Sequence, residues 1–331
     1  MGVVGGAAFE DETGLNRPTR CTVPDFVHKP VMAAEVLDAL KPRPDGRYAD
    51  GTIGGAGHAA IILGASSPTG WLFGCDRDGD AVEAARARLA EFAGRFEIRR
   101  GNFAELADWV PAAGCDGVLL DLGVSSRQLD CAGRGFSFQH DGPLDMRMDT
   151  RQSLTAADLI NGASADELAK IFWELGGERD ARRFAKAMVR GRERQKFETT
   201  RQLAEFIEKI SPRHGKKAHP ATKVFQSLRI AVNDELGSLK RGLDAAVKTL
   251  KRGGRLAVIT FHSLEDRVVK DFGRARSRDY TFAGGVDVPE LREPRVPELK
   301  WVTRKAIKPG AAEIAENPRS RSAQLRVMEK I

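Results

Sequence analysis

The segment Asp116–Asp130 joins a short apolar run to side chains that can bind a ligand or take part in proton transfer. Val118–Leu120 has the length and residue types of a buried parallel strand, and Asp121 follows it directly, ahead of a glycine and two serines. Ligands bind at the carboxyl ends of the strands in open α/β sheets. We therefore expect the Asp121 carboxylate to face a bound ligand.

A second candidate ligand site is the glycine-rich segment Gly51–His58, which lies between a strand-like run and an apolar helix. A glycine turn at this place lets a ligand approach the backbone and points helix amides at an anion. Asp76 ends the next strand, about 20 residues on, where a carboxylate can accept hydrogen bonds from two ribose hydroxyls. NAD and S-adenosylmethionine (SAM) enzymes share this arrangement. An acidic strand end such as Asp121 favours SAM, because its reactive centre is a sulfonium cation.

Strand-like runs that alternate with helical patterns must position these side chains. Such alternation predicts an α/β fold with a doubly wound, mostly parallel sheet, the Rossmann-like class. Helical periodicity predicts one long helix over Ala221–Leu250, and two late runs, Trp301–Ile307 and Gln324–Met328, are expected to pair at the sheet edge. The five earlier strands are predicted at Arg47–Asp50, Gly70–Asp76, Phe96–Phe103, Val118–Leu120 and Arg255–Phe261.

The alternation stops between about residues 133 and 217, where the sequence predicts only loops and helices. Capping boxes at Ser164 and Thr199 each open a helix with one apolar face. We therefore expect one cofactor-binding domain, residues 25–132 and 218–331, interrupted by a helical insertion, residues 133–217, and preceded by a flexible extension, residues 1–24. A basic segment lies between the two capped helices and contains Arg179, Arg182, Arg183, Lys186, Arg190, Arg192, Arg194 and Lys196.

Several longer motifs are shared with one known family. They are Asp116–Asp130, Arg134–Phe138, Asp141–Asp149, His219–Thr222, Arg229–Leu236, Phe261–Arg267 and Asn317–Ala323. In these motifs the chain, from about Phe26 onward, closely resembles the bacterial ribosomal small-subunit RNA cytosine-N4 methyltransferases, the MraW-type family. The resemblance implies a class I SAM-dependent methyltransferase that methylates the exocyclic N4 amine of a cytosine in the decoding region of 16S rRNA.

The resemblance also implies the residues that contact the cofactor. They are Ala56, Gly57, His58, Asp76, Phe103, Asp121 and Gln128. Asp121 is the candidate catalytic residue, because its carboxylate, with the carbonyls of Leu122 and Gly123, can accept hydrogen bonds from an amine. The Asp/Asn-Pro-Pro-aromatic motif that amino-methylating enzymes carry at this place is absent, which leaves the proton acceptor open.

Substrate binding is expected from residues that lie outside the cofactor loops. An unstacked base needs a pocket with aromatic walls, which Phe136 and Phe138 could supply. Asp145 and Arg147 could add polar contacts. Asn233 on the long helix and His262 at the end of the fifth strand complete the candidate set, whereas Glu235 is interpreted as part of a polar helix face.

The composition suggests the partners of the protein. The 331 residues include 53 Lys+Arg against 46 Asp+Glu, a net charge of +7 that suits a polyanionic partner. The resemblance to the MraW-type family implies that this partner is small-subunit rRNA or the small ribosomal subunit, and no DNA is expected. The basic insertion segment and seven further cations are expected to contact RNA phosphates. These cations are Lys300, Arg304, Lys305, Lys308, Arg319, Arg321 and Arg326.

The sequence also indicates what the protein lacks. The four cysteines show neither a disulfide framework nor metal-ligand spacing, so no metal is expected. No apolar run approaches the ~18 residues of a membrane span, and we expect a cytoplasmic protein. Two alternatives to the methyltransferase stay open, an NAD-dependent oxidoreductase and a non-catalytic RNA-binding assembly factor, and the oligomeric state is not indicated.

Overall fold

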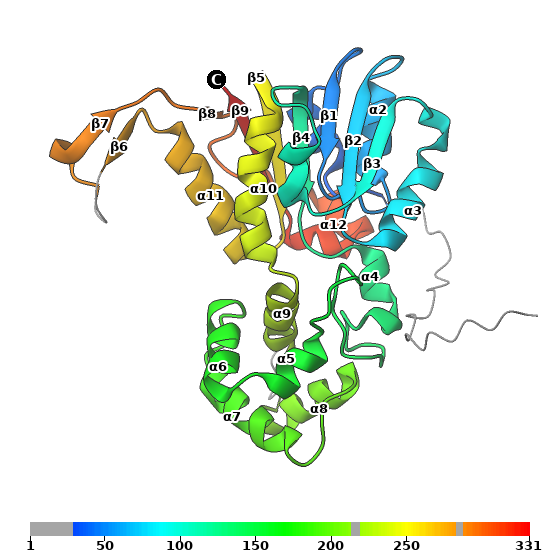
Figure 1. Ribbon diagram of the computed structural model, residues 1–331, viewed down its shortest axis with the longest axis vertical. Coiled ribbons are helices and arrows are strands. Elements are labelled where there is room, and N and C mark those ends of the chain that lie inside the picture. Colours follow the sequence, from blue (N-terminus) through cyan, green and yellow to red (C-terminus); the bar gives the residue numbers. More distant parts are fainter. Residues whose placement is uncertain (1–28, 213–218, 283–286) are drawn as a thin grey trace, which may run out of the picture.

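The strands of the protein form one large sheet with helices on both faces (Figure 1). The computed structural model describes residues 29–212, 219–282 and 287–331. The expected N-terminal extension, residues 1–24, and the expected boundary between residues 217 and 218 lie outside the described residues. Among these residues, no helix combines the length and the apolar character that crossing a membrane would need.

Seven strands follow the order β3-β2-β1-β4-β5-β9-β8. The first five are parallel, whereas β9 runs antiparallel to both β5 and β8. This arrangement confirms the predicted doubly wound, mostly parallel sheet. The strands are β1 (Arg47–Asp50), β2 (Trp71–Asp76), β3 (Phe96–Arg100), β4 (Cys115–Asp121), β5 (Leu250–Thr260), β8 (Leu299–Trp301) and β9 (Gln324–Lys330).

Each face of the sheet has its own apolar core, which explains the uninterrupted apolar run of β4. Leu119 packs on the face covered by α1 (Ala33–Leu40), α2 (Gly57–Ala65) and α3 (Gly79–Arg88). Val118 and Leu120 pack on the opposite face, which α10 (Glu235–Thr249) and α11 (Ser263–Ser277) cover. Because successive strand residues point to opposite faces, a strand buried on both sides must be apolar at every position.

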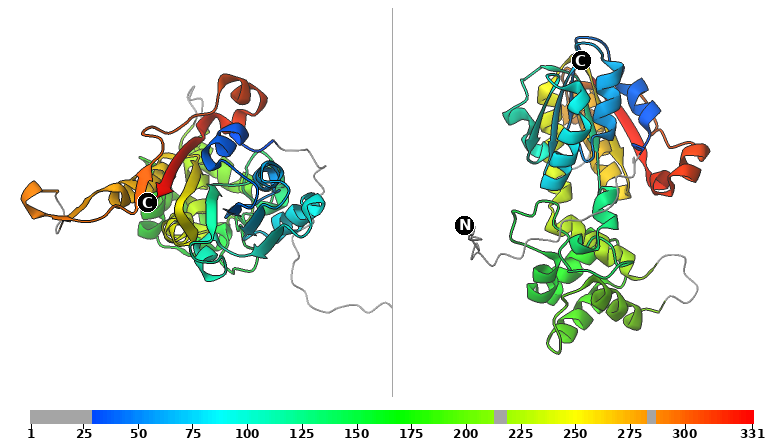
Figure 2. Two further views of the ribbon diagram at one scale, coloured as in Figure 1. Left: turned by 90° about the horizontal axis from the view of Figure 1, so that it is seen from above. Right: turned by 90° about the vertical axis from the view of Figure 1, so that its right-hand side faces the viewer.

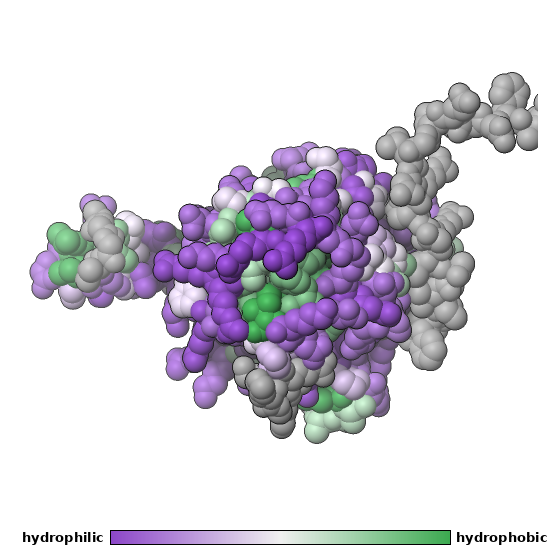
Figure 3. Space-filling model, turned by 90° about the horizontal axis from the view of Figure 1, so that it is seen from below, coloured by the Kyte–Doolittle hydropathy of each residue, from purple (hydrophilic) through white to green (hydrophobic). Residues whose placement is uncertain are grey.

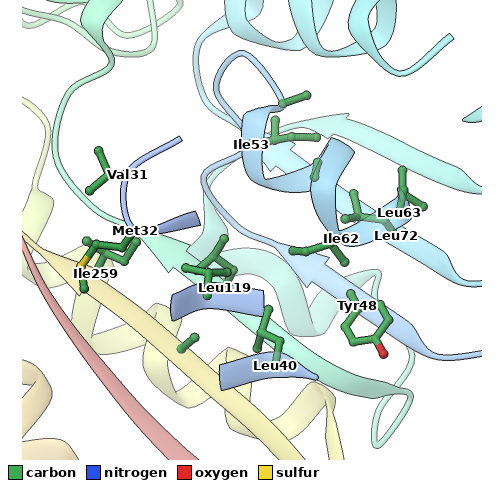
Figure 4. Packing of buried hydrophobic residues seen from close by; sticks show 14 of the residues in the cluster. Val31, Met32, Leu40, Tyr48, Ile53, Ile62, Leu63, Leu72, Leu119 and Ile259 are labelled. Carbon is green, nitrogen blue, oxygen red and sulfur yellow. The ribbon is translucent and has the colours of Figure 1, made fainter. Parts of the chain in front are cut away.

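The core under α1 and α2 brings together side chains from six strands, and Figure 4 labels examples from β1, β2, β4 and β5. Tyr48 and Leu72, from β1 and β2, are fully buried there with Leu119 and Ile259. The Tyr48 hydroxyl accepts a hydrogen bond from the backbone N–H of Arg43 at 2.9 Å, so the polar end of this ring is satisfied. Burial of a polar group without such a partner would cost several kcal/mol, on the order of 2–7.

The helices of the insertion form a third apolar cluster, which lies below the sheet (Figure 2). Both predicted capping boxes are present: Ser164 accepts from the N–H of Glu167, and Thr199 accepts from that of Gln202. Each box satisfies two backbone amides that a helix start would otherwise leave unpaired. These helices are α5 (Ala156–Gly162), α6 (Ala165–Glu174), α7 (Ala181–Arg192) and α8 (Thr200–Ile210), with the short α4 (Ser126–Asp130) preceding them.

The prediction of one long helix over residues 221–250 is wrong, because the chain forms two helices. α9 spans Ala221–Val232, and α10 begins at Glu235. Asp234 between them has a left-handed backbone, with φ at 45°, which interrupts the helical hydrogen bonding. The apolar side of α9 packs in the cluster of the insertion helices, whereas that of α10 packs on the sheet.

The late part of the chain closes the far edge of the sheet and extends beyond it. The predicted strand over Trp301–Ile307 is shorter than expected and shifted, because only residues 299–301 pair with β9 and Ile307 forms an isolated bridge to Leu325. A separate antiparallel ribbon, β6 (Tyr280–Phe282) and β7 (Arg292–Pro294), projects beyond α11 (Figure 1). The last helix, α12 (Ala311–Glu316), lies between β8 and β9 in the sequence.

Candidate functional site at the carboxyl edge of the sheet

The predicted glycine turn connects β1 to α2, as expected. Ala56 caps α2 with a left-handed backbone at φ 59°, a conformation that is uncommon outside glycine and asparagine. A Cβ added at Gly55 would meet no atom within 4 Å, so the space beside this residue is open. At Gly57 the missing side chain serves packing, because an added Cβ would lie 3.2 Å from Pro30.

The Asp76 carboxylate lies at the carboxyl end of β2, directly beside this turn. Its Oδ2 accepts a hydrogen bond from the Gly54 N–H at 3.0 Å, and its Oδ1 accepts one from the Asp78 N–H at 2.9 Å. Burial is the main reason that the pKa of Asp76 rises to about 6, and the nearby Asp78 carboxylate adds to the effect. Asp78, and not Asp76, is the residue that caps α3.

Asp121 is the last residue of β4, and one of its carboxylate oxygens has no hydrogen-bond partner. Its Oδ1 is buried without a hydrogen-bond partner, and its Oδ2 lies 3.6 Å from Nδ1 of His58. The other ring nitrogen of His58, Nε2, lies 2.8 Å from the Val31 carbonyl and must donate to it. Nδ1 of the neutral ring therefore presents a lone pair to Asp121. Burial raises the pKa of Asp121 well above its ordinary value, as do the nearby Asp50 and Glu265 carboxylates.

Three carboxylates without a cationic side-chain partner thus gather at this edge. Asp50, which the sequence analysis did not select, ends β1 and is 1% exposed, and burial raises its pKa to about 7. Among the described residues, no Lys or Arg forms an ion pair with Asp50, Asp76 or Asp121. A ligand that carries positive charge would relieve this excess negative charge. The sulfonium and ammonium groups of SAM fit that requirement.

These raised pKa values predict how the stability of the ligand-free protein depends on pH. Asp50 and Asp76 favour the protonated form in the folded state, so their contribution is complete below pH ~4 and is lost as pH rises through about 6 and 7. For Asp50 the loss is on the order of 2–4 kcal/mol. We expect the Asp50→Asn variant to lose less thermal stability than the wild type between pH 5 and 8. Melting temperatures of both proteins, measured across this pH range, give the difference. If the melting temperature falls equally with pH in the variant and the wild type, the expected role of Asp50 is contradicted.

Phe103 follows β3 and starts a 3-10 helix, η2 (Phe103–Asp108), that packs on α10. A Cβ added at Gly242 of α10 would lie 2.2 Å from a carbon of the Phe103 ring, and one added at Gly51 would lie 2.8 Å from its Cβ. The ring is therefore held between α10 and the start of the glycine turn. The predicted contact with the cofactor stays a prediction.

Replacement of Gly242 by alanine is expected to displace the Phe103 ring. Overpacking of this kind costs about 1–3 kcal/mol of unfolding free energy. If the ring also borders the cofactor, SAM affinity falls in the same variant. Gly64→Ala in α2 is the matched control, because an added Cβ there meets no atom within 4 Å and should leave stability unchanged or raised. Equal stability of the two variants would contradict the packing role of Gly242.

The side-chain amide of Gln128, a predicted cofactor contact, forms hydrogen bonds with other residues of the protein. Its Oε1 accepts from the Ser125 N–H within a capping box of α4, and its Nε2 donates to Asp78 Oδ2 at 2.9 Å. The same Asp78 oxygen accepts from Nη1 of buried Arg134 at 2.7 Å. Gln128 therefore orders the loop after β4 and ties it to the start of α3.

The two phenylalanines expected to form a base-binding wall also contribute to packing. Phe136 is buried in the cluster of the insertion helices, and the Arg134 guanidinium lies 5.9 Å from its ring centre. Phe138 packs against the rings of His219 and Phe225, with ring centres 4.7 Å and 4.9 Å away. Both rings anchor their loop, and their contact with a substrate stays a prediction.

The polar residues expected on the substrate side hold the same loop in place. Asp145 and Arg147 form an ion pair with two hydrogen bonds, at 2.7 Å and 2.8 Å. Asn233 is 2% exposed; it accepts from the Met148 N–H at 2.7 Å and donates to the Met146 carbonyl at 2.8 Å. The interruption between α9 and α10 thus coincides with the residue that clamps this loop.

His262 lies just after β5, in a cluster of charged groups that the sequence did not reveal. It caps α11, and its Nε2 lies 3.2 Å from an oxygen of Glu265, which is 2% exposed. Glu235, interpreted from sequence as part of a polar face, forms a two-bond ion pair with Arg229 instead. Ligand atoms of Glu235, His262 and Glu265 all lie within 4.8 Å of one another, but Arg229 already supplies the cluster with a cation.

Comparison with known proteins identifies the family of the chain. Three relatives, each named ribosomal RNA small subunit methyltransferase H, align with 92% of the chain. The protein of Geobacter sulfurreducens is 52% identical over 311 residues and 99% of its own length. Those of Symbiobacterium thermophilum and Magnetococcus marinus are 48% and 46% identical, with 97% and 99% of their lengths covered. The profile of the MraW methylase family matches residues 25–331, and the chain therefore belongs to this family of SAM-dependent methyltransferases.

Proposed function

We propose that this protein methylates the exocyclic N4 amine of a cytosine in the decoding region of 16S rRNA. The observation that carries the proposal is the Asp121 carboxylate, which ends β4 with one buried oxygen unpaired. Family membership supports a SAM-dependent methyl transfer, and the names of the relatives support small-subunit rRNA as the substrate.

The residues around the glycine turn would hold SAM. Asp76 keeps a free lone pair on each carboxylate oxygen for the ribose hydroxyls, and the open space at Gly55 lets a ligand approach the backbone. Asp50 and Asp121 would compensate the positive charge of the ligand. Ala56, Gly57, His58, Phe103 and Gln128 complete the proposed cofactor set. When bound, SAM supplies a methyl group attached to a sulfonium centre.

Asp121 would orient the amine and accept its proton. The amine of cytosine is a poor nucleophile, because its lone pair is delocalised into the ring. A hydrogen bond from the amine to Oδ1 of Asp121 would direct that lone pair toward the methyl carbon. As the nitrogen forms its new bond to carbon, it becomes acidic and releases a proton. The raised pKa makes the Asp121 carboxylate a stronger base than an ordinary aspartate, which favours uptake of that proton.

The insertion helices would contact the RNA. Residues 133–217 would form the recognition domain between the two parts of the SAM-binding domain. The end of the molecule where these helices lie presents hydrophilic side chains around an apolar hollow (Figure 3). Arg192 is used internally, since it donates to the carbonyls of Ile160 and Ala163. The exposed cations of the basic segment would contact phosphates: Arg179, Arg182, Arg183, Lys186, Arg190, Arg194 and Lys196.

The substrate-side residues would place the target nucleotide. Phe136 and Phe138 would border the base, while Asp145, Arg147, Asn233 and His262 would shape the pocket around it.

An RNA partner, as free rRNA or within the small ribosomal subunit, would place the reaction in the cytoplasm.

The NAD-dependent alternative is not favoured. In the described part of the chain the sheet continues beyond β5 with antiparallel β9 and β8, where a dinucleotide-binding fold has a sixth parallel strand. The second alternative, a non-catalytic RNA-binding assembly factor, is distinguished from the methyltransferase by the methyl-transfer assay described next.

The proposal is tested by transfer of a labelled methyl group from SAM to 16S rRNA in the presence of the wild-type protein. Matched substrates with single cytosine-to-uridine changes in the decoding region locate the target base. We expect labelling that one such change abolishes. Tight NADH binding without SAM binding, or RNA binding without methyl transfer to any rRNA substrate, would overturn the proposal.

A further inference from the structure

A basic pocket lies between α11 and the segment that follows β8. The pocket is open to solvent and has a volume of about 410 Å³. Trp301, Ala306 and Gln324 line it without charge, and no carboxylate is among its lining residues. Six cations complete the lining: Lys270, Arg274, Arg304, Lys305, Lys308 and Arg326.

Only part of this positive charge is compensated within the protein. Asp266, at the start of α11, binds Arg326 at 2.6 Å and Lys270 at 3.4 Å. The other four cations are exposed, and they form no ion pair with any described residue. Like charges held this close repel one another, so a polyanion that enters the pocket would be attracted by their summed field.

One wall of the pocket is fixed by close packing. A Cβ added at Gly273 of α11 would lie 2.2 Å from a carbon of the Trp301 indole, so the ring lies flush against the helix backbone. The Arg326 guanidinium lies 6.0 Å from the centre of the same ring. The cationic side chains therefore surround a closely packed base, which helix α11 and strand β9 provide.

The pocket lies near the edge of the sheet that carries the proposed active site. Asp121 of β4 pairs in register with Ile259 of β5, and Val258 of β5 pairs with Arg326 of β9. Two strand spacings separate Asp121 from Arg326, a distance of roughly 10 Å across the sheet. Helix α11 begins beside His262 and carries Lys270 and Arg274 into the pocket.

We infer that this pocket binds the phosphodiester backbone of the RNA strand that carries the target cytosine. This inference rests on the proposed function and adds a second RNA contact, on the sheet domain, to the one proposed for the insertion helices. An open pocket with four uncompensated cations suits several consecutive phosphates of an extended strand better than one small anion. It would hold nucleotides that flank the target base while the insertion contacts another part of the RNA.

The triple variant Arg274→Gln, Arg304→Gln, Lys305→Gln tests the inference with side chains that are exposed and outside the SAM site. We expect KM for the RNA to rise about 10-fold, and the slope of log affinity against log salt to fall by about 2. The kcat at saturating RNA and the Kd for SAM should not change. Lys41→Gln with Arg252→Gln, two exposed cations that line a pocket at the opposite edge of the sheet, is the control.

The outcomes separate this inference from the proposed function. If the triple variant keeps the wild-type salt slope and KM, the pocket inference is overturned. The proposed function still stands in that case, provided that the wild type methylates the RNA. An equal loss in the control pair would also overturn it, because net charge would then explain the effect. If the wild type methylates no RNA, the proposed function fails. Filter binding of the same RNA then still measures the slope of log affinity against log salt and tests the pocket separately. Loss of inorganic phosphate binding with unchanged RNA binding would identify a small-anion site instead and would contradict the inference.

Discussion

The Asp121→Asn variant is expected to lose about 10³-fold in kcat for methyl transfer. The asparagine oxygen can still accept a hydrogen bond from the amine, but it cannot take up the proton that the nitrogen releases. Removal of a positioned proton acceptor typically costs 10²–10⁴-fold in rate. The stability of the ligand-free variant should rise at pH 8, because the substitution removes a buried, unpaired carboxylate.

Single-turnover methylation with saturating SAM and RNA measures this effect directly. Asp108→Asn is a suitable control, since Asp108 is an exposed carboxylate at the end of η2 and should leave kcat unchanged. A kcat within 3-fold of the wild type for Asp121→Asn would show that another group accepts the proton, with ~3-fold corresponding to less than 1 kcal/mol.

The Asp76→Asn variant is expected to weaken SAM binding by about 10–100-fold. Asp76 is positioned to accept hydrogen bonds from two ribose hydroxyls, and a hydrogen bond to a charged group contributes about 1.5–3 kcal/mol. The asparagine has nearly the same shape and keeps one acceptor oxygen, so the fold should be retained. The Gly54 N–H or the Asp78 N–H would lose its partner, which adds a modest cost in stability.

Isothermal titration calorimetry with SAM gives the affinity, and a melting curve reports whether the fold persists. Asp80→Asn provides the matched control, because Asp80 lies in the first turn of α3 with a half-exposed side chain. Unchanged SAM affinity in Asp76→Asn would refute the assigned role of this carboxylate. An equal loss in Asp80→Asn would point to a general effect of charge.

The sheet could be predicted from sequence because its signals are local. Each of the first five strands contains apolar residues and is bounded by turn residues. The capping boxes at Ser164 and Thr199 mark helix starts through contacts within four residues. The division of the long helix could not be predicted this way. It depends on Asn233, whose side chain bonds to residues 146 and 148, far away in the sequence.

The cofactor side of the site was partly predictable for a geometric reason. Asp76 and Asp121 each end a parallel strand, and parallel strands bring their carboxyl ends to one edge. Asp50 ends β1 in the same way, but the sequence offered no sign that its carboxylate would be buried without a cation. That none of the three carboxylates forms an ion pair with a described Lys or Arg is a property of the packed structure alone.

The substrate side shows where sequence reasoning fails. Phe136 and Phe138 were selected because aromatic residues in a polar loop can stack on a base, yet both rings also pack inside the structure. Glu235 was assigned to a polar helix face, and it forms a partly buried ion pair with Arg229. Side chains of one type can serve packing or binding, and only their neighbours in space distinguish the two roles.

The most direct test of the proposed reaction is mass spectrometry of modified nucleosides. The purified protein would be incubated with SAM and small ribosomal subunits from cells that lack the homologous activity, and the rRNA would then be digested to nucleosides. The proposed reaction predicts a gain of N4-methylcytidine in the wild-type sample and about 10³-fold slower formation of it in the Asp121→Asn sample. A different methylated nucleoside, or no product although SAM binds, would contradict it.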